Sequence, residues 1–295
     1  MHDDEIVISD EVVRGLIDSQ FPEWSLEQIV RIQSSATVNA IFKIGEKFAA
    51  RFPLRPDEPE LIRKALEEEA MASAEFIRCS PFPAPAPVAI GTAGAGYQLP
   101  WSVQSWLPGT VAAHTDAGES GAFARDLAAL VIALRQADTG GRKFRGRSRG
   151  GNLSDHDDWV ETCIRESATM FDAHRLEEMW SYFRMLPRTS ADVMTHGDLT
   201  PHNILVDRGR LAGVLDCGGF GPADPALDVI SGWHLLEDEP RKLFRAELEC
   251  DELEWERSKA WAFEQALGAV WYYEESNPGM HNMGYLTLSR VIASC

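Results

Sequence analysis

The spacing of apolar side chains predicts alternating helices and strands over the first hundred residues. The predicted order is helix 10–22, strands 38–45 and 47–54, helix 60–78, and a further pair of strands around 88–106. Asp10 is available to cap the first helix, and Gly45 with Glu46 suits a tight hairpin between the first two strands. This part of the chain is therefore expected to be mostly β-structure with two helices.

After Leu107 the pattern becomes helical. Apolar residues recur at helical spacing over 120–137, 154–185, 222–236, 239–249, 252–275 and 281–294. Two short runs, "NILVD" and "LAGVLD", interrupt these helices and are typical of strands. The predicted fold class is α+β, with a small β-rich N-terminal lobe (residues 1–107) and a larger helical C-terminal lobe (residues 108–295).

The net charge limits the partners of the protein. The 295 residues include 28 Lys and Arg against 46 Asp and Glu, which gives a formal net charge of -18. A field of that sign repels nucleic acids and anionic membranes and attracts cationic small molecules. We therefore expect a small-molecule partner, and neither a nucleic acid nor a membrane.

The chain also lacks the usual signals of export. Its first residues are acidic, whereas a signal peptide begins with basic residues that are followed by an apolar stretch. No apolar run approaches the roughly 18 residues that span a bilayer. The five cysteines are scattered, without CxxC spacing, and are expected to be reduced thiols that hold no metal. These features predict a cytoplasmic protein.

A cluster of polar and ionisable residues stands immediately before a strand, in "MTHGDLTPHNILVD". It contains His196, Asp198, His202 and Asn203, and Asp216 ends the next strand-like run. If these two runs pair as a hairpin, Asn203 and Asp216 approach each other with Asp198 nearby. A lone Asp and Asn at this spacing are usually loop or capping residues, but the added histidine and second aspartate favour a catalytic site.

Magnesium-dependent phosphoryl transfer requires this set of side chains. Asn203 and Asp216 supply hard oxygen ligands that would hold Mg²⁺ against a nucleoside triphosphate. Asp198 would orient an attacking hydroxyl and accept its proton.

The sequence resembles the aminoglycoside phosphotransferase family, which has a bilobal protein-kinase-like fold. "HGDLTPHNILV" matches the family's H-G-D-x-x-x-x-N catalytic loop, and "DCGGFGPADPALD" matches its metal-binding segment, D-x-G-x-x-G-x-x-D-P-x-x-D. The similarity extends from "SQFPEW" to "YYEESNP" and is strongest to the branch that borders the macrolide phosphotransferases.

The resemblance assigns roles to the matching positions. It implies that Asp198 is the catalytic aspartate and that His196 braces the catalytic loop. Asn203 and Asp216 match the two metal ligands. Two later acidic positions, Asp224 and Asp228, are expected to be structural, through helix capping or ties to the catalytic loop.

The N-terminal lobe is expected to bind the nucleotide. Arg51 occupies the strand position at which protein kinases carry a phosphate-binding lysine, although a surface arginine is the alternative. On the helix over 60–78, Glu69 shares one face with Ile62 and Leu66, whereas the glutamates just before it turn towards solvent. A half-buried carboxylate needs a partner, so we predict that Glu69 pairs with Arg51.

Phosphate and base contacts complete the predicted nucleotide site. The kinase glycine-rich loop is absent, and in its place "QSSATVNA" offers the hydroxyl and N–H groups of Ser35 and Thr37, next to Ser34. The segment "VQSWLPG" is the predicted hinge, where backbone groups of Ser105 and Leu107 would bind the purine. Backbone contacts of this kind leave open whether the donor is ATP or GTP.

The acceptor site is expected among the helices after residue 216. The acidic candidates are Glu237, Asp238, Glu239, Glu264, Glu274 and Glu275, which would suit an aminoglycoside. The aromatic candidates are Trp233, Trp261, Trp271, Tyr272 and Tyr273, which would suit a macrolide or another apolar alcohol. The one basic segment, "GGRKFRGRSRGG" at 140–151, is either a surface loop or a contact for an anionic group.

These predictions describe a Mg²⁺-dependent enzyme that transfers the γ-phosphoryl group of ATP or GTP to a hydroxyl of an antibiotic, either an aminoglycoside or a macrolide. Such an activity confers antibiotic resistance. A housekeeping kinase of a small metabolite, such as choline, homoserine or a sugar, is the first alternative. A nucleotide-binding pseudoenzyme is the second, although Asp198, Asn203 and Asp216 are all present.

Overall fold

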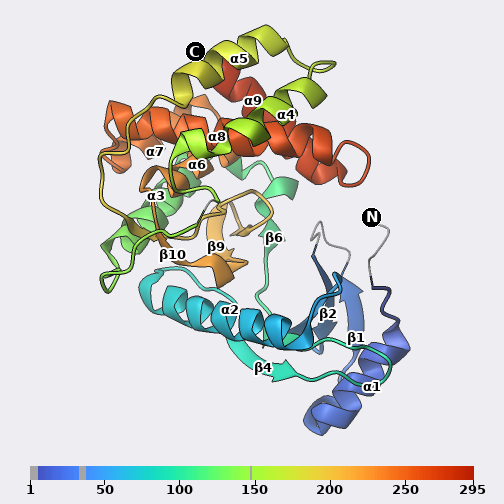
Figure 1. Cartoon of the computed structure of the whole chain (residues 1–295). Helices are drawn as coiled ribbons and strands as arrows, with labels where there is room; N and C mark the ends of the chain where they lie inside the picture. Colours follow the sequence, from blue (N-terminus) through green and yellow to red (C-terminus); the bar gives the residue numbers. More distant parts are fainter. Residues whose placement is uncertain (1–5, 33–37, 147) are drawn as a thin grey trace. The chain divides into compact units, whose positions relative to one another are not determined.

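The computed structural model describes residues 6–32, 38–146 and 148–295. The chain divides into two compact units, which are described separately below (Figure 1). The first unit comprises Met1–Arg78, Pro83–Pro108 and Asp216–Gly218, and the second comprises Cys79–Phe82, Gly109–Leu215 and Gly219–Cys295.

The first unit is built on a five-stranded antiparallel sheet with the strand order β1-β2-β3-β5-β4. The strands are β1 (Ile29–Ile32), β2 (Asn39–Ile44), β3 (Phe48–Pro53), β4 (Pro87–Gly91) and β5 (Trp101–Ser105). The two predicted hairpins are present, and Gly45 supplies the positive φ of 53° that the first turn requires. The edge strand β1 was not predicted from the sequence. Its four residues are all at least partly exposed, so buried and exposed positions do not alternate along it.

Two helices accompany this sheet. Helix α1 (Asp10–Gln20) packs its buried face against the sheet, so that Leu16 shares one core with Phe52 and Trp101, whose rings stack at a centroid distance of 4.8 Å. Ser9, rather than Asp10, caps α1, because the hydroxyl of Ser9 accepts a hydrogen bond from the N–H of Val12 at 3.3 Å. Helix α2 (Pro59–Cys79) is the helix predicted to carry Glu69.

The second unit is mainly helical. Its helices are α3 (Gly121–Gln136), α4 (Asp157–Glu166), α5 (Ala173–Phe183), α6 (Ala226–Leu235), α7 (Asp238–Glu247), α8 (Glu252–Tyr272) and α9 (Pro278–Ala293). Helix α8 is buried over most of its length and packs closely against α9 (Figure 1). Gly284 allows this approach, because a Cβ atom there would lie 2.8 Å from the carbonyl oxygen of Ala266.

The prediction of one continuous helix over 154–185 is wrong. The structure has a short 3-10 helix at Leu153–His156, then α4, and then a break before α5. Asp172 starts α5 anew, because its carboxylate accepts hydrogen bonds from the N–H groups of His174 and Arg175. Apolar periodicity alone continues through such a break, because both helices bury one face.

Two small sheets complete the second unit. The strands are β6 (Thr110–Val111), β7 (Val193–Thr195), β8 (Ile204–Asp207), β9 (Arg210–Val214) and β10 (Gly221–Ala223), in the orders β6-β8-β9 and β10-β7. The predicted hairpin is β8-β9, whose two turn residues, Arg208 and Gly209, both have positive φ. Strand β7 ends directly before His196, so the polar cluster lies in the loop between β7 and β8. Each of these strands is hydrogen-bonded to another strand of its own sheet.

A β-rich first unit and a helical second unit agree with the predicted α+β class. Within the described ranges, none of the helices combines the length and apolar character needed to cross a membrane.

Candidate active site

The loop between β7 and β8 is held by a buried carboxylate from α6. Asp228, which is 1% exposed, accepts hydrogen bonds at 2.8 Å from the N–H groups of both His196 and Gly197. Gly197 has a φ of 83°, which only glycine adopts without strain. Burial raises the pKa of Asp228, and the neighbouring His196 side chain together with the two N–H donors opposes that shift. The polar loop is therefore tied to the core of the second unit.

His196 joins the two strand ends of this region. Its Nε2 lies 2.9 Å from the carbonyl oxygen of Leu215, which can only accept, so Nε2 carries the proton. Its Nδ1 then accepts a hydrogen bond from the N–H of Asp198 at 3.2 Å. One buried imidazole thus fixes the backbone at Asp198 relative to the residue that precedes Asp216.

The carboxylate of Asp198 is held from three sides. Its Oδ2 accepts a hydrogen bond from Nδ2 of Asn203 at 2.9 Å. Its Oδ1 accepts hydrogen bonds from Nε2 of Gln265 at 2.7 Å and from a guanidinium nitrogen of Arg149 at 3.1 Å. The side chain is still 41% exposed, so a bound molecule can reach it.

Asn203 is oriented by its own hydrogen bonds. Nδ2 donates to the carbonyl oxygen and the carboxylate of Asp198, and the backbone oxygen of Asn203 accepts from the N–H of Leu215 at 2.7 Å. Because both of these side-chain hydrogen bonds use Nδ2, the amide oxygen of Asn203 takes no part in them. Asp216 follows Leu215 directly, just after the end of β9.

The first unit brings Arg51 and Glu69 together, as the sequence predicts. One nitrogen of Arg51 lies 3.5 Å from Glu69, and a second lies 3.2 Å from Asp216. Burial raises the pKa of Glu69, and the charge of Arg51 opposes that shift. The contact requires Gly218, because a Cβ atom there would lie 2.8 Å from Cγ of Glu69.

Asp216 itself adopts an uncommon backbone conformation. Its φ is 57°, in the left-handed region that few residues other than glycine occupy. A non-glycine residue held there is frequently part of a functional site. The conformation directs the Asp216 carboxylate to Arg51 within the first unit.

The remaining predicted nucleotide contacts are less complete. Ser35 and Thr37 lie outside the described residues. Ser105 exchanges two hydrogen bonds with Ala86, each of 2.8 Å, through its N–H and its hydroxyl oxygen. The N–H of Ser105, one of the predicted base contacts, is therefore already bonded within the sheet, next to the half-buried Leu107.

The sequence analysis missed Gln265 and His234, and it included Arg149 only within the basic segment 140–151, without assigning it a contact with Asp198. His234 lies on α6, where its Nε2 donates to Oε1 of Gln265 at 3.2 Å and its Nδ1 accepts from the hydroxyl of Thr287 at 2.9 Å. These bonds turn the Nε2 group of Gln265 towards Asp198. Gln265 stands 67 residues from Asp198 in the chain, and no local pattern signals the pairing.

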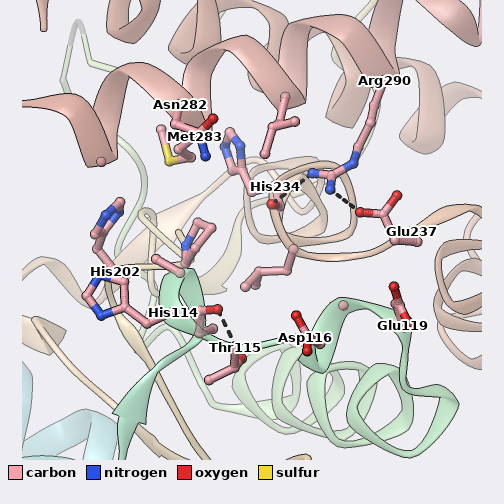
Figure 2. A pocket seen from close by; sticks show the side chains of 17 residues that line it. His114, Thr115, Asp116, Glu119, His202, His234, Glu237, Asn282, Met283 and Arg290 are labelled. Atoms are coloured by element: carbon pink, nitrogen blue, oxygen red, sulfur yellow. Dashed lines mark hydrogen bonds and ion pairs between the residues drawn. The ribbon is translucent and has the colours of Figure 1, made fainter.

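A cavity of about 240 Å³ lies within the second unit and is lined in part by Pro201 and His202, from the loop between β7 and β8 (Figure 2). Its charged and ionisable lining residues are His114, Asp116, Glu119, His202, His234, Glu237 and Arg290. Arg290 pairs with Glu237, which leaves an excess of carboxylates around the cavity. Burial and the nearby His114 lower the pKa of His202, which favours its neutral form.

Most of the predicted acceptor residues lie elsewhere. Glu237 lines the cavity, but the other acidic and aromatic candidates do not. Glu264 is buried against His156 at 2.9 Å, and Trp261 donates a hydrogen bond to Asp224. The indole N–H of Trp261 and Oε1 of Glu264 are therefore bonded inside the protein, whereas Oε2 of Glu264 is buried without a hydrogen-bond partner among the described residues.

A loop of the pattern H-G-D-x-x-x-x-N, fixed by a buried aspartate, together with an arginine–glutamate pair in a β-rich unit, is typical of kinase-like phosphotransferases. The model of the phosphotransferase enzyme family matches residues 29–261. The chain belongs to this family, which confirms the resemblance found in the sequence.

Curated relatives match a short part of the chain. An aminoglycoside 3'-phosphotransferase of Escherichia coli is 36% identical over 63 residues, which are 21% of this chain and 23% of the relative. The protein of the same description from Salmonella typhimurium is 35% identical over 74 residues, or 23% of this chain and 27% of the relative. The matched region is thus about a quarter of the length of these relatives.

Solved structures match almost the whole chain. The GDP complex of aminoglycoside 2'-phosphotransferase-IIIa has a TM-score of 0.73 at 15% identity, covering 97% of this chain and 99% of that one. A macrolide 2'-phosphotransferase from Brachybacterium faecium has a TM-score of 0.59 at 18% identity, covering 89% and 91%. At this identity the similarity concerns the fold, and it confirms the predicted kinase-like architecture.

Proposed function

We propose that the protein is a small-molecule O-phosphotransferase. It moves the γ-phosphoryl group of ATP or GTP to a hydroxyl of an antibiotic, an aminoglycoside or a macrolide. The observation that carries the proposal is the fixed carboxylate of Asp198, which Asn203 and Gln265 hold in one orientation while it stays accessible. Preorganised groups of this kind are what phosphoryl transfer needs, because catalysis consists of positioning and charge stabilisation.

Asp198 has the role of orienting the acceptor hydroxyl and taking its proton. His196 and Asp228 keep the backbone of Asp198 in place, so they act as positioning residues. The hydroxyl oxygen forms its bond to phosphorus as the bond to the bridging oxygen breaks, and the nucleoside diphosphate leaves with the bonding electrons.

Asn203 and Asp216 are the proposed ligands of Mg²⁺. An amide oxygen and a carboxylate are the hard oxygen donors that this ion prefers, so the residues fit it. Among the residues that the structure describes, no three His, Cys, Asp or Glu side chains form a metal site. Mg²⁺ is usually held by one or two carboxylates together with waters and substrate phosphates. The bound ion would neutralise charge on the triphosphate.

Arg51, oriented by Glu69, is the proposed ligand of the nucleotide phosphates. Ser35 and Thr37 would add phosphate contacts, and backbone groups of Ser105 and Leu107 would bind the base. Similar structures include complexes with GDP and with ATP, which support a purine nucleotide as donor. Such nucleotides are abundant in the cytoplasm, where we expect the enzyme to act.

The cavity beside His202 is the proposed acceptor site. Two of its carboxylates, Asp116 and Glu119, would attract a cationic acceptor, and similar structures contain kanamycin, gentamicin or streptomycin. The relay from His234 through Gln265 connects the wall of this cavity to Asp198. Two hydrogen bonds thus link the proposed acceptor site to the carboxylate proposed to activate the acceptor.

The size of the cavity favours a second candidate. Its volume of about 240 Å³ lies below the roughly 300–1,000 Å³ of sites that enclose drug-sized ligands. A small metabolic alcohol would fill this space, whereas an antibiotic would extend beyond it. A kinase of a small metabolite is thus the alternative function.

The test is Mg²⁺-dependent transfer from ATP and GTP to a panel of aminoglycosides, macrolides and small alcohols. The variant Asp198→Ala is expected to lose transfer by at least a hundredfold while still binding nucleotide, and Asp216→Ala to weaken binding of the magnesium nucleotide. The exposed Asp158→Ala is the matched control and should keep full activity. Transfer that survives in Asp198→Ala would show that another group carries the reaction.

A further inference from the structure

We propose that Arg149 is a further catalytic residue, whose guanidinium group binds the transferred phosphoryl group beside Asp198. This inference rests on the proposed function, because it places the phosphoryl group next to that carboxylate. Arg149 would offset the negative charge that gathers where the acceptor oxygen, phosphorus and Asp198 come together. No motif of the catalytic loop contains this residue.

The backbone that follows Arg149 is anchored in the core of the second unit. The carbonyl oxygen of Gly150 accepts a hydrogen bond from the N–H of Asp224 at 3.0 Å. The carbonyl oxygen of Gly151 accepts one from the guanidinium of Arg257 at 3.3 Å. Asp224 and Arg257 are themselves a buried ion pair with an N–O distance of 2.5 Å. The end of the basic segment is therefore a built part of the fold rather than a loose surface loop.

Close packing restricts the same stretch further. Gly150 has a φ of 102°, and a Cβ atom there would lie 2.7 Å from Cβ of Ala223. Gly151 lies against the ring of Phe144, where a Cβ atom would be 2.8 Å from the nearest ring carbon. The N–H of Phe144 in turn donates to Asp192 at 2.7 Å. These contacts restrict the backbone next to Arg149, whose side chain reaches Asp198.

The hydrogen bonds of Asp198 show that Arg149 is not needed to hold it. Asn203 and Gln265 already bond its two carboxylate oxygens, at 2.9 Å and 2.7 Å. Arg149 adds one longer contact of 3.1 Å to an oxygen that Gln265 already occupies. A guanidinium that binds a carboxylate for structural reasons usually does so through two parallel hydrogen bonds. The single contact indicates that Arg149 has donors directed at something else.

The donor inventory of Arg149 supports this. Its Nε is buried and has no hydrogen-bond partner among the described residues. The side chain as a whole is 29% exposed, so a bound ligand can reach its outer nitrogens. A guanidinium fork with unused N–H groups matches the oxygens of a phosphoryl group. The charges agree, since Arg149 is the only cation bonded to Asp198 in the described parts of the chain.

Arg149 would reduce the repulsion between two negatively charged groups, the transferred phosphoryl group and Asp198. The γ-phosphoryl oxygens carry negative charge and approach the carboxylate of Asp198, so the two groups repel each other. A fixed guanidinium between them lowers the energy of the arrangement in which the acceptor oxygen bonds to phosphorus. The hydroxyl proton passes to Asp198, and the diphosphate leaves with the electrons of the broken bond.

The first test measures steady-state transfer in Arg149→Met, Arg149→Lys and Arg149→Ala. For Arg149→Met we expect kcat to fall by about 10²–10³, with the KM values for nucleotide and acceptor changing by less than about threefold. Lysine should restore part of kcat, and added guanidinium ion at millimolar concentration should restore part of the activity of Arg149→Ala. The matched control is Arg145→Ala, an exposed arginine of the same basic segment, which should keep wild-type kcat.

A second measurement is independent of the acceptor. Nucleoside diphosphate with Mg²⁺ and aluminium fluoride mimics the transferring phosphoryl group, and Arg149→Met should bind this mixture at least a hundredfold more weakly than wild type does. Its affinity for the magnesium diphosphate alone, and its thermal stability, should stay unchanged. A purely structural arginine would lower all three quantities together, and that result would overturn the inference.

The two proposals fail in different ways. A wild-type protein that neither transfers nor hydrolyses the triphosphate, and does not bind the fluoride complex, would refute the proposed function and the inference with it. A wild-type protein that does transfer phosphate, alongside an Arg149→Met variant with the same kcat, would refute only the role of Arg149.

Discussion

His234 lies inside the second unit with both ring nitrogens bonded, and its protonation is expected to destabilise the protein in acid. Burial lowers the pKa of His234 to about 4, from the ordinary 6.5 of a histidine. The bond with Gln265 and the charge of Asp198 oppose this shift, whereas Arg149 and Arg290 reinforce it. A neutral ring is also what the hydrogen bonds require, because Nδ1 accepts from the hydroxyl of Thr287.

The sign of the effect follows from proton binding. Below pH 6.5 the unfolded chain takes up a proton on His234 that the folded protein does not bind. The free energy of unfolding therefore falls as the pH drops from 6.5 to about 4, and this contribution becomes constant below that range. The difference between a pKa of 6.5 and one of about 4 corresponds to about 3 kcal/mol lost between pH 7 and pH 4.

Urea denaturation at pH 7 and pH 4 measures this loss in the wild type and in His234→Gln. Glutamine can still donate to Gln265 but does not titrate, so the variant should lose about 3 kcal/mol less than the wild type between these pH values. His174→Gln is the control, because His174 is exposed and its replacement should leave the pH dependence unchanged. Equal losses in the wild type and His234→Gln would refute the reasoning.

Three further substitutions test the supports of the site. Asp224→Ala leaves Arg257 buried without its carboxylate partner, so the free energy of unfolding in urea titrations should fall by about 3–5 kcal/mol. A loss below about 1 kcal/mol would mean that the ion pair is solvated. Gly150→Ala combines a strained φ with a Cβ contact of 2.7 Å, so thermal denaturation should show a loss of about 2–4 kcal/mol; an unchanged midpoint would contradict the packing. Asp228→Asn offers one acceptor where two N–H groups need one each, so it should cost about 1–3 kcal/mol and reduce kcat of transfer. Full activity in Asp228→Asn would show that the loop around His196 does not depend on this carboxylate.

Several features of the fold were predictable because they depend on neighbours in the chain. The hairpins β2-β3 and β8-β9 follow from short apolar runs around turn residues, and both are present. The pairing of Arg51 with Glu69 followed from helical spacing, because a carboxylate aligned with an apolar stripe needs a partner. The break before α5 was not predictable from periodicity, since both flanking helices bury one face.

The sequence by itself determined the family, the α+β class and the loop that contains Asp198 and Asn203, because each is encoded in contiguous residues. The tertiary structure alone decided what surrounds that loop. Gln265 and Arg149 reach Asp198 from positions 67 and 49 residues away, and the cavity beside His202 is lined by several separate segments. Such contacts depend on how helices pack and how glycines let backbones approach each other, and no local pattern of side chains records that.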